Sequence, residues 1–193
     1  MANQQNNVRP SDVSSEANSL SFALKQMLNR ATFIELVQVV AVGDKVCTVK
    51  PLIAQQKVDG SKIQTTAVEN IPYLQLQMGS SAIIMKPQKG DIGILLCCDK
   101  DTSNVLKNKA ESLAATNFTH SRKNGVYLGG VGLLNNDPTE YIEFTGNGIN
   151  IVGNIKLTGS LNASGDVTAQ GVSLHDHTHK GVQTGTGSTS APQ

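Results

Sequence analysis

Apolar residues recur at helical spacing near the start of the chain, over residues 15–31. The apolar positions are Leu20, Ala23, Leu24, Met27, Leu28 and Ala31. Residues three and four apart share one face of a helix, so this spacing predicts an amphipathic helix. Ser14 or Ser15 can cap its first turn, where Glu16 also suits the helix dipole. The apolar stripe would pack against other copies of the chain or a hub protein, or it would cover its own domain.

A different pattern, typical of β-strands, runs from residue 33 to residue 99. The predicted strands are residues 34–42, 45–51, 62–68, 82–85 and 92–97. Gly43 and Asp44 form a turn signal between the first two, and residues 87–91 form another before the last. About five strands of mixed length predict a small closed barrel of the OB type.

A repeat with a six-residue period occupies residues 147–179. Its glycines are Gly153, Gly159, Gly165 and Gly171. Between them, apolar residues lie two apart around one polar residue, in the pairs Ile149 and Ile151, Ile155 and Leu157, Leu161 and Ala163, and Val167 and Ala169. This is alternation on very short strands with a glycine corner after each. Short hexapeptide repeats of this kind predict a β-helix or β-prism.

The number of hexads indicates that one chain cannot complete this structure. A stacked array needs at least three repeats, and usually more, to bury a continuous core, so four or five hexads leave an apolar face uncovered. Three chains wound about a common axis would each supply one wall, which predicts an intertwined trimer. The inward residues also shrink along the repeat, and a close-packed interior leaves no voids. The prism should therefore taper towards its C-terminal end.

Three histidines follow the last, shortened hexad: His175, His177 and His179. Residues i and i+2 of a strand point the same way, so a His-x-His pair faces the axis. Two imidazoles from each of three chains would surround one ion with six nitrogens, which suits an octahedral metal. Zinc prefers four ligands, whereas iron, cobalt and nickel all accept imidazole. The alternative is a histidine-rich surface tract that binds no metal.

The C-terminal part of the chain resembles a known family. Residues 165–174, the His177-Thr178-His179 motif and the glycine-rich run 180–188 resemble the tips of contractile-tail phage central spikes. These are membrane-piercing baseplate proteins of the P2-type spike and Gp138-like families. The resemblance implies an iron ion, one per trimer, held by six histidines from three His-x-His motifs.

Those ligands correspond to His177 and His179. His175 is an additional histidine, and spacing alone leaves it possible that His175 and His177 form the ligand pair. We expect His175 to pack or hydrogen-bond one layer above the ion.

The order of helix, barrel and repeat also resembles these spikes, as do the patterns at residues 49–53 and 87–93. The tail, residues 180–193, is either disordered or closes the end of the prism, and the resemblance favours closure.

The sequence therefore predicts a mainly β chain in four parts. They are an N-terminal arm and helix (residues 1–31), an OB-fold-like barrel (32–110), a linker and neck (111–139), and a trimeric β-helical spike with a metal-bound tip (140–193).

Composition narrows the possible partners. Formal net charge is +1, and no basic stripe appears, so nucleic acid is not an expected partner. No apolar run is long enough to span a bilayer, and no secretory signal is visible. Cys47, Cys97 and Cys98 form neither a disulfide framework nor a metal-ligand spacing, which is typical of a protein made in a reducing cytoplasm, here that of the host.

The predicted protein is a non-enzymatic homotrimer at the baseplate tip of a virion. It would be driven into the host cell envelope on contraction, below the hub and tail tube proteins. No catalytic residue is predicted, and His120 has no accompanying nucleophile pattern. The alternatives are a hexapeptide-repeat trimeric acyltransferase and the spike or tip of a related contractile injection system.

Overall fold

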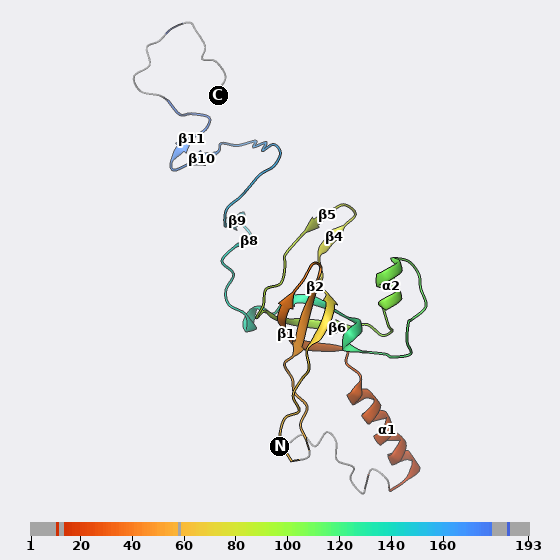
Figure 1. Cartoon of the computed structure of the whole chain (residues 1–193). Helices are drawn as coiled ribbons and strands as arrows, with labels where there is room; N and C mark the ends of the chain where they lie inside the picture. Colours follow the sequence, from red (N-terminus) through yellow and green to blue (C-terminus); the bar gives the residue numbers. More distant parts are fainter. Residues whose placement is uncertain (1–10, 12–13, 58, 179–184, 186–193) are drawn as a thin grey trace. The chain divides into compact units, whose positions relative to one another are not determined.

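The computed structural model describes residues 11, 14–57, 59–178 and 185. The chain divides into two compact units, residues Met1–Asp137 and Pro138–Gln193. Most of its regular structure is β, as predicted, with one long helix in the first unit (Figure 1). None of the described helices combines the length and apolar character needed to cross a bilayer.

The predicted N-terminal helix is confirmed as α1, Glu16–Arg30. The Ser15 hydroxyl accepts a hydrogen bond from the Asn18 N–H at 3.2 Å, which satisfies one of the free donors of the first turn. Glu16 lies in that turn, where its charge favours the helix dipole. Leu20, Leu24, Met27 and Leu28 are all exposed. The apolar stripe therefore does not cover the domain of its own chain.

A five-stranded antiparallel sheet forms the centre of the first unit. Its strands are β1 (Ile34–Val42), β2 (Val46–Pro51), β3 (Val68–Pro72), β6 (Ile92–Cys97) and β7 (Gly125–Gly130). Their order in the sheet is β3-β2-β1-β6-β7. Buried and less buried residues alternate along β2 and β6, as expected for strands with one face on a core.

The sheet curls until its two edge strands approach each other (Figure 1). A parallel bridge joins Tyr73, just after β3, to Tyr127 in β7, and the Leu74 N–H donates to the Tyr127 carbonyl oxygen at 2.8 Å. The enclosed core consists of Val37, Val39, Cys47, Val49, Ile71, Tyr73, Leu95, Cys97 and Tyr127. The result is a curled half-barrel whose apolar residues come from all five strands and the residue after β3.

Two of the predicted strands and part of the predicted neck need correction. Residues 62–68 form no strand apart from an isolated bridge between Gln56 and Lys62; the third strand of the sheet, β3, begins only at Val68. Residues 82–85 contribute to a separate hairpin, β4 (Leu76–Met78) with β5 (Ser81–Ile83), outside the main sheet. Residues 125–130, assigned to the neck, form β7 of the sheet.

Backbone contact explains the glycine-rich sequence of β7. A Cβ at Gly93 in β6 would collide with the Gly129 carbonyl oxygen and the Tyr127 hydroxyl. Gly129 itself has a φ of 130°, a conformation that side chains rarely adopt. These glycines therefore allow β6 and β7 to pair across a bulge between Ile94 and Leu95.

Two side-chain clamps hold the segments around β7 to the sheet. Arg122, in a short 3-10 helix (Arg122–Asn124), donates to both carboxylate oxygens of Glu35 in β1, at 2.6 and 2.8 Å. Asn135, after a second 3-10 helix (Gly132–Leu134), accepts from the Ile92 N–H and donates to the Ile92 and Val131 carbonyls. Helix α2, Ser103–Asn108, lies between β6 and β7 in the chain.

The second unit contains two small hairpins. One pairs β8 (Tyr141–Phe144) with β9 (Ile149–Val152), and the other pairs β10 (Thr168–Ala169) with β11 (Val172–Ser173). Residues 153–167 contain no strand, although the repeat predicts short strands at 155–157 and 161–163. Every large apolar side chain from Tyr141 to Leu174 is exposed. A single chain thus provides no core for the predicted repeat.

Candidate metal site

The candidate site is built on the small hairpin that ends the hexad repeat. Ala169 and Val172 pair directly, which leaves Gln170 and Gly171 as a two-residue turn. Both turn residues have positive φ, 51° and 80°. This is the conformation of the type I′ turn, whose twist matches that of paired strands. The shortened last hexad, in which Val172 follows Gly171 directly, therefore corresponds to a tight reversal of the chain.

A hydrogen-bonded turn over residues 174–176 follows this hairpin and is organised by Ser173. The Ser173 hydroxyl oxygen accepts from the His175 N–H at 3.1 Å and from the Asp176 N–H at 2.8 Å. The Leu174 N–H donates to the Val167 carbonyl oxygen at 2.8 Å, which ties the turn to the start of the hairpin. The backbone just before His177 is thereby fixed by local contacts.

Asp166 completes the network on the other side of the hairpin. Its carboxylate accepts from the His175 N–H at 3.2 Å. A hydrogen bond from the Ser173 side chain, together with backbone N–H groups of His175, Val167 and Leu174, holds the pKa of Asp166 below its usual value. The carboxylate therefore carries its charge at neutral pH and acts as a hydrogen-bond acceptor for the turn.

The His177 ring is oriented by backbone carbonyls. Its Nδ1 lies 3.0 Å from the Ser173 carbonyl oxygen and 3.2 Å from that of Leu174. Carbonyl oxygens only accept hydrogen bonds, so these contacts favour the tautomer with the proton on Nδ1. In that neutral tautomer Nε2 carries the lone pair. Metal-bound histidines commonly show this arrangement, in which the second nitrogen donates to a carbonyl or carboxylate.

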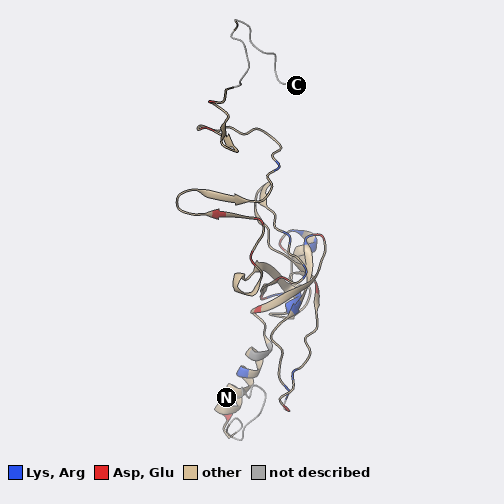
Figure 2. Cartoon of the chain, turned by 90° about the vertical axis from the view of Figure 1, so that its left-hand side faces the viewer, with Lys and Arg blue, Asp and Glu red and all other residues tan. Residues whose placement is uncertain are grey.

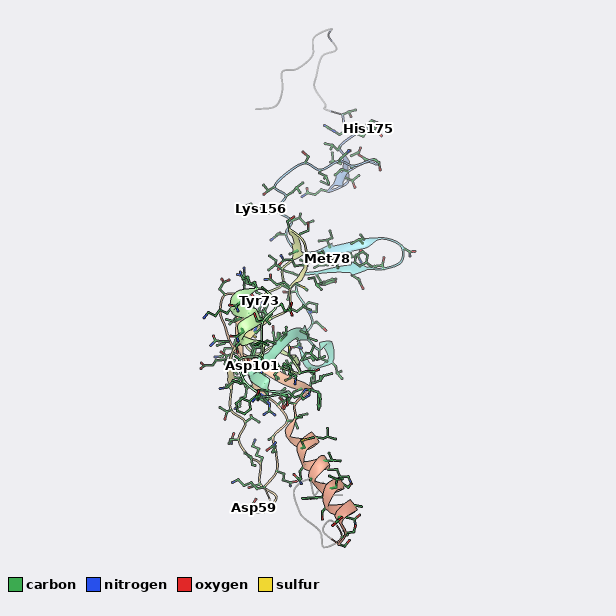
Figure 3. The ribbon with its side chains drawn as sticks, turned by 90° about the vertical axis from the view of Figure 1, so that its right-hand side faces the viewer. Asp59, Tyr73, Met78, Asp101, Lys156 and His175 are labelled. Carbon is green, nitrogen blue, oxygen red and sulfur yellow. The ribbon has the colours of Figure 1, made fainter. Side chains whose placement is uncertain are left out.

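The other two predicted ligands are placed differently. His175 lies in the turn and not on a strand, so the expected in–out alternation does not apply to it. Its side chain is 83% exposed, and its Nε2 is 3.8 Å from an Asp176 carboxylate oxygen (Figure 3). His179 lies outside the described residues. Within the part of the chain that the structure describes, no three His, Cys, Asp or Glu side chains gather into a metal-binding group.

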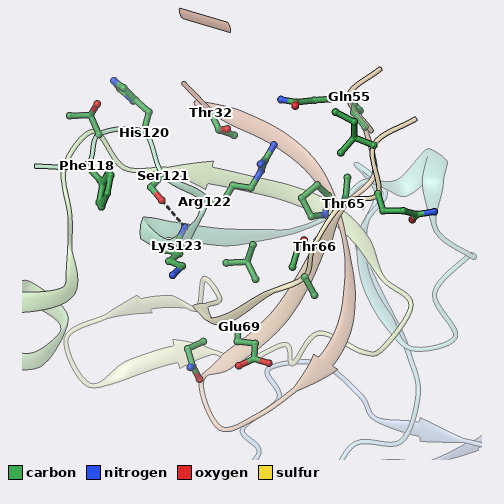
Figure 4. A pocket seen from close by; sticks show the side chains of 18 of the residues that line it. Thr32, Gln55, Thr65, Thr66, Glu69, Phe118, His120, Ser121, Arg122 and Lys123 are labelled. Carbon is green, nitrogen blue, oxygen red and sulfur yellow. Dashed lines mark hydrogen bonds between the residues drawn. The ribbon is translucent and has the colours of Figure 1, made fainter. Parts of the chain in front are cut away.

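A groove of about 1060 Å³ in the first unit is the main alternative location for a site. The groove is lined by polar and apolar residues together, with His120, Arg122 and Lys123 among its polar side chains (Figure 4). The His120 ring packs on Phe33 with centroids 4.2 Å apart, and its Nδ1 is 3.5 Å from an Asp99 oxygen without forming a hydrogen bond. Arg122 is paired with Glu35. Both residues thus have structural partners.

Comparison with known families adds one finding. A family model described as "GpV Apex motif" matches residues 171–193. The match points to the tip of a phage tail spike. It begins at the Gly171 turn of the hairpin and includes His175, His177 and His179. No curated protein matches the sequence of the chain.

The residues matched by the family model include the hydrogen-bonded turn over residues 174–176 that precedes His177. Sequence reasoning selected the three histidines but missed Asp166 and Ser173, which fix the turn before His177. The only signal for them was the one-residue deletion in the last hexad, since a broken period indicates a local departure from the repeat. The match supports a tail component of a virion and a phage spike tip.

Proposed function

We propose that this protein is the central, envelope-puncturing spike of a contractile phage tail. It acts as a homotrimer without enzymatic activity, and one iron ion joins the three tips through His177 and His179 of each chain. The observation that carries the proposal is the spike-apex motif over residues 171–193, directly after a hexad repeat whose apolar residues are exposed in the single chain.

The β8–β9 hairpin supports assembly with other copies. Ile142 pairs with Ile151 and Phe144 with Ile149, so these four side chains share one face of the hairpin. They are 62%, 52%, 77% and 58% exposed, respectively. The hairpin thus presents an apolar face, whereas its other side carries Glu143 and Asn150 together with Tyr141 and Val152. Such a face suits the interior of a prism in which three chains each supply one wall.

Helix α1 offers a second apolar surface of the same kind. Leu20, Leu24, Met27 and Ala31 follow one another at steps of four, three and four residues. Steps of four and three alternate here, as in the seven-residue repeat of helices that pack along a common seam with a period of 3.5 residues. A bundle of three α1 helices would cover the stripe, and a hub protein is the other partner that fits it.

The residues present fit an interchain metal. The described part of one chain holds too few ligands for an ion, whereas three chains would bring three His177 rings with Nε2 lone pairs, together with three His179 rings. An ion bound there supplies a crosslink between the three chains. His175, whose ring is directed to Asp176, is assigned no ligand role.

The first unit serves in this proposal as an OB-type platform between the spike and the hub and tube. Its strand order, β3-β2-β1-β6-β7, with the parallel contact between Tyr73 and Tyr127, supports that barrel type. Nucleic acid is not proposed as a partner. Basic and acidic segments are interspersed along the ribbon, with most of it uncharged (Figure 2), and formal net charge is only +1.

Two other functions were considered. A hexapeptide-repeat acyltransferase would share the trimer and intersubunit histidines, but the apex motif and the short repeat favour a spike. The spike of a related contractile injection system would share nearly all the architecture. Tube and sheath genes beside this one, with or without capsid genes, would distinguish that system from a phage.

A double substitution tests the proposed site. His177→Ala with His179→Ala should remove the iron and destabilise the end of the spike, because both ligands of every chain are lost. The barrel should stay folded, as judged by circular dichroism. His175→Ala is the matched control and should retain the ion. Metal content equal to that of the natural protein in the double variant would refute the assignment.

A further inference from the structure

We infer that Ser173 and Asp166 are positioning residues for the metal ligand His177, an inference that rests on the proposed function. Neither residue is offered as a ligand. Ser173 builds the turn whose carbonyl oxygens hold the His177 ring, and Asp166 accepts a hydrogen bond from the same turn. The structure assigns to this pair the orientation of His177 that presents Nε2 to a metal.

Both lone pairs of the Ser173 hydroxyl are used within the turn. A hydroxyl has two lone pairs and one proton. The lone pairs accept the N–H groups of His175 and Asp176, at 3.1 and 2.8 Å. No lone pair is left on this hydroxyl to bind an ion, so its role is structural within the turn.

The turn connects this hydroxyl to the histidine ring. His177 Nδ1 contacts the carbonyl oxygens of Ser173 and Leu174, the residue that carries the hydroxyl and the one after it. If the two N–H groups lost their acceptor, residues 174–176 could leave the turn and these carbonyls would move. The ring would then lose the contacts that select its tautomer and direction.

Asp166 acts one step further from the ring. It accepts from the His175 N–H at 3.2 Å, the same N–H that donates to Ser173, and it lies two residues before the hairpin strand β10. The pair therefore ties the turn that precedes His177 to the residue at which the hairpin begins. Partners of this kind typically change metal affinity by about 10–100-fold when removed, while the ligands themselves remain.

The test compares metal affinity among trimers of the full chain. Each protein is stripped of metal and titrated with Co²⁺, whose visible spectrum reports the coordination geometry. Ser173→Ala should raise the Kd for Co²⁺ by about 10–100-fold and alter that spectrum. Ser173→Thr keeps the hydroxyl and should restore both. Thr168→Ala is the matched control, because Thr168 pairs with Ser173 across the hairpin and makes no described hydrogen bond to the turn.

The outcomes separate this inference from the proposed function. If the natural trimer binds Co²⁺ and Ser173→Ala binds it equally well, the positioning role is wrong and the proposed function stands. If Thr168→Ala loses as much affinity as Ser173→Ala, the effect is general destabilisation and the inference is again wrong. A natural protein that binds no Co²⁺ overturns both. Should Ser173→Ala fail to assemble, Asp166→Asn measures the same linkage with the hydroxyl in place.

Discussion

Ile151 in β9 allows the proposed assembly to be tested at a single side chain. It lies on the apolar face of the β8–β9 hairpin, opposite Ile142, and is 52% exposed in the single chain. Complete burial of an isoleucine side chain contributes about 1.5–3 kcal/mol. The exposed half is therefore worth roughly 0.8–1.5 kcal/mol per chain, or about 2.5–4.5 kcal/mol for three chains that bury it together.

Ile151→Ser should weaken the trimer by that amount. Since about 1.4 kcal/mol corresponds to a factor of ten, the dissociation constant should rise by roughly two to three orders of magnitude. Sedimentation velocity over a dilution series measures the change. Asn150→Ser, on the other face of the same strand, is the matched control and should have little effect. Equal trimer stability in Ile151→Ser and the natural protein would contradict the placement of this face inside the assembly.

Two further predictions concern the five-stranded sheet. Arg122→Ala leaves the Glu35 carboxylate, which is 9% exposed, without its partner. The free energy of unfolding in urea should therefore fall by about 2–4 kcal/mol, a loss that is moderated because the Arg122 side chain is 37% exposed. A loss below about 0.5 kcal/mol would show that water replaces the ion pair. Burial raises the pKa of Cys47 and Cys97 from 9.0 to about 11, so these thiols ionise first in the unfolded chain. The stability of the folded chain should therefore decline above pH 9, by up to about 1.4 kcal/mol per pH unit for each thiol. Unfolding measured from pH 8 to pH 10.5 tests this, and a flat profile would contradict it.

Local patterns were sufficient for the elements with strong periodicity. The stripe that includes Leu20 and Leu24 predicted α1, and short segments rich in Val and Ile predicted β1, β2 and β6. Each of these patterns is contained in one segment, so it can be recognised from the local sequence. Strand β3 was missed because it carries Glu69 and Asn70 and ends at Pro72, which is a weak strand pattern.

The rest of the five-stranded sheet depends on contacts between segments far apart in the sequence. β7 contains three glycines, and its strand character depends on close approach to Gly93, which lies more than 30 residues earlier in the chain. No local pattern carries that information. The hairpin of β4 and β5 similarly has apolar residues, such as Met78 and Ile83, without contributing to the main sheet.

The sequence predicted the histidine ligands of the candidate site but not the hydrogen-bonded turn that supports His177. The His-x-His spacing identified His177, and the motif match covers that residue. The turn at residues 174–176 was not predicted, because alternation was extended through His175 as if a strand continued. Ser173 and Asp166 act through hydrogen bonds to backbone groups, and such contacts leave no periodic signal in a sequence.

Native mass spectrometry of the full-length protein, with identification of the bound metal, tests the central claim most directly. The account predicts a species of three chains carrying one iron ion, and loss of that ion in the variant lacking His177 and His179. A metal-free monomer at micromolar concentration would contradict the trimer and the metal site together.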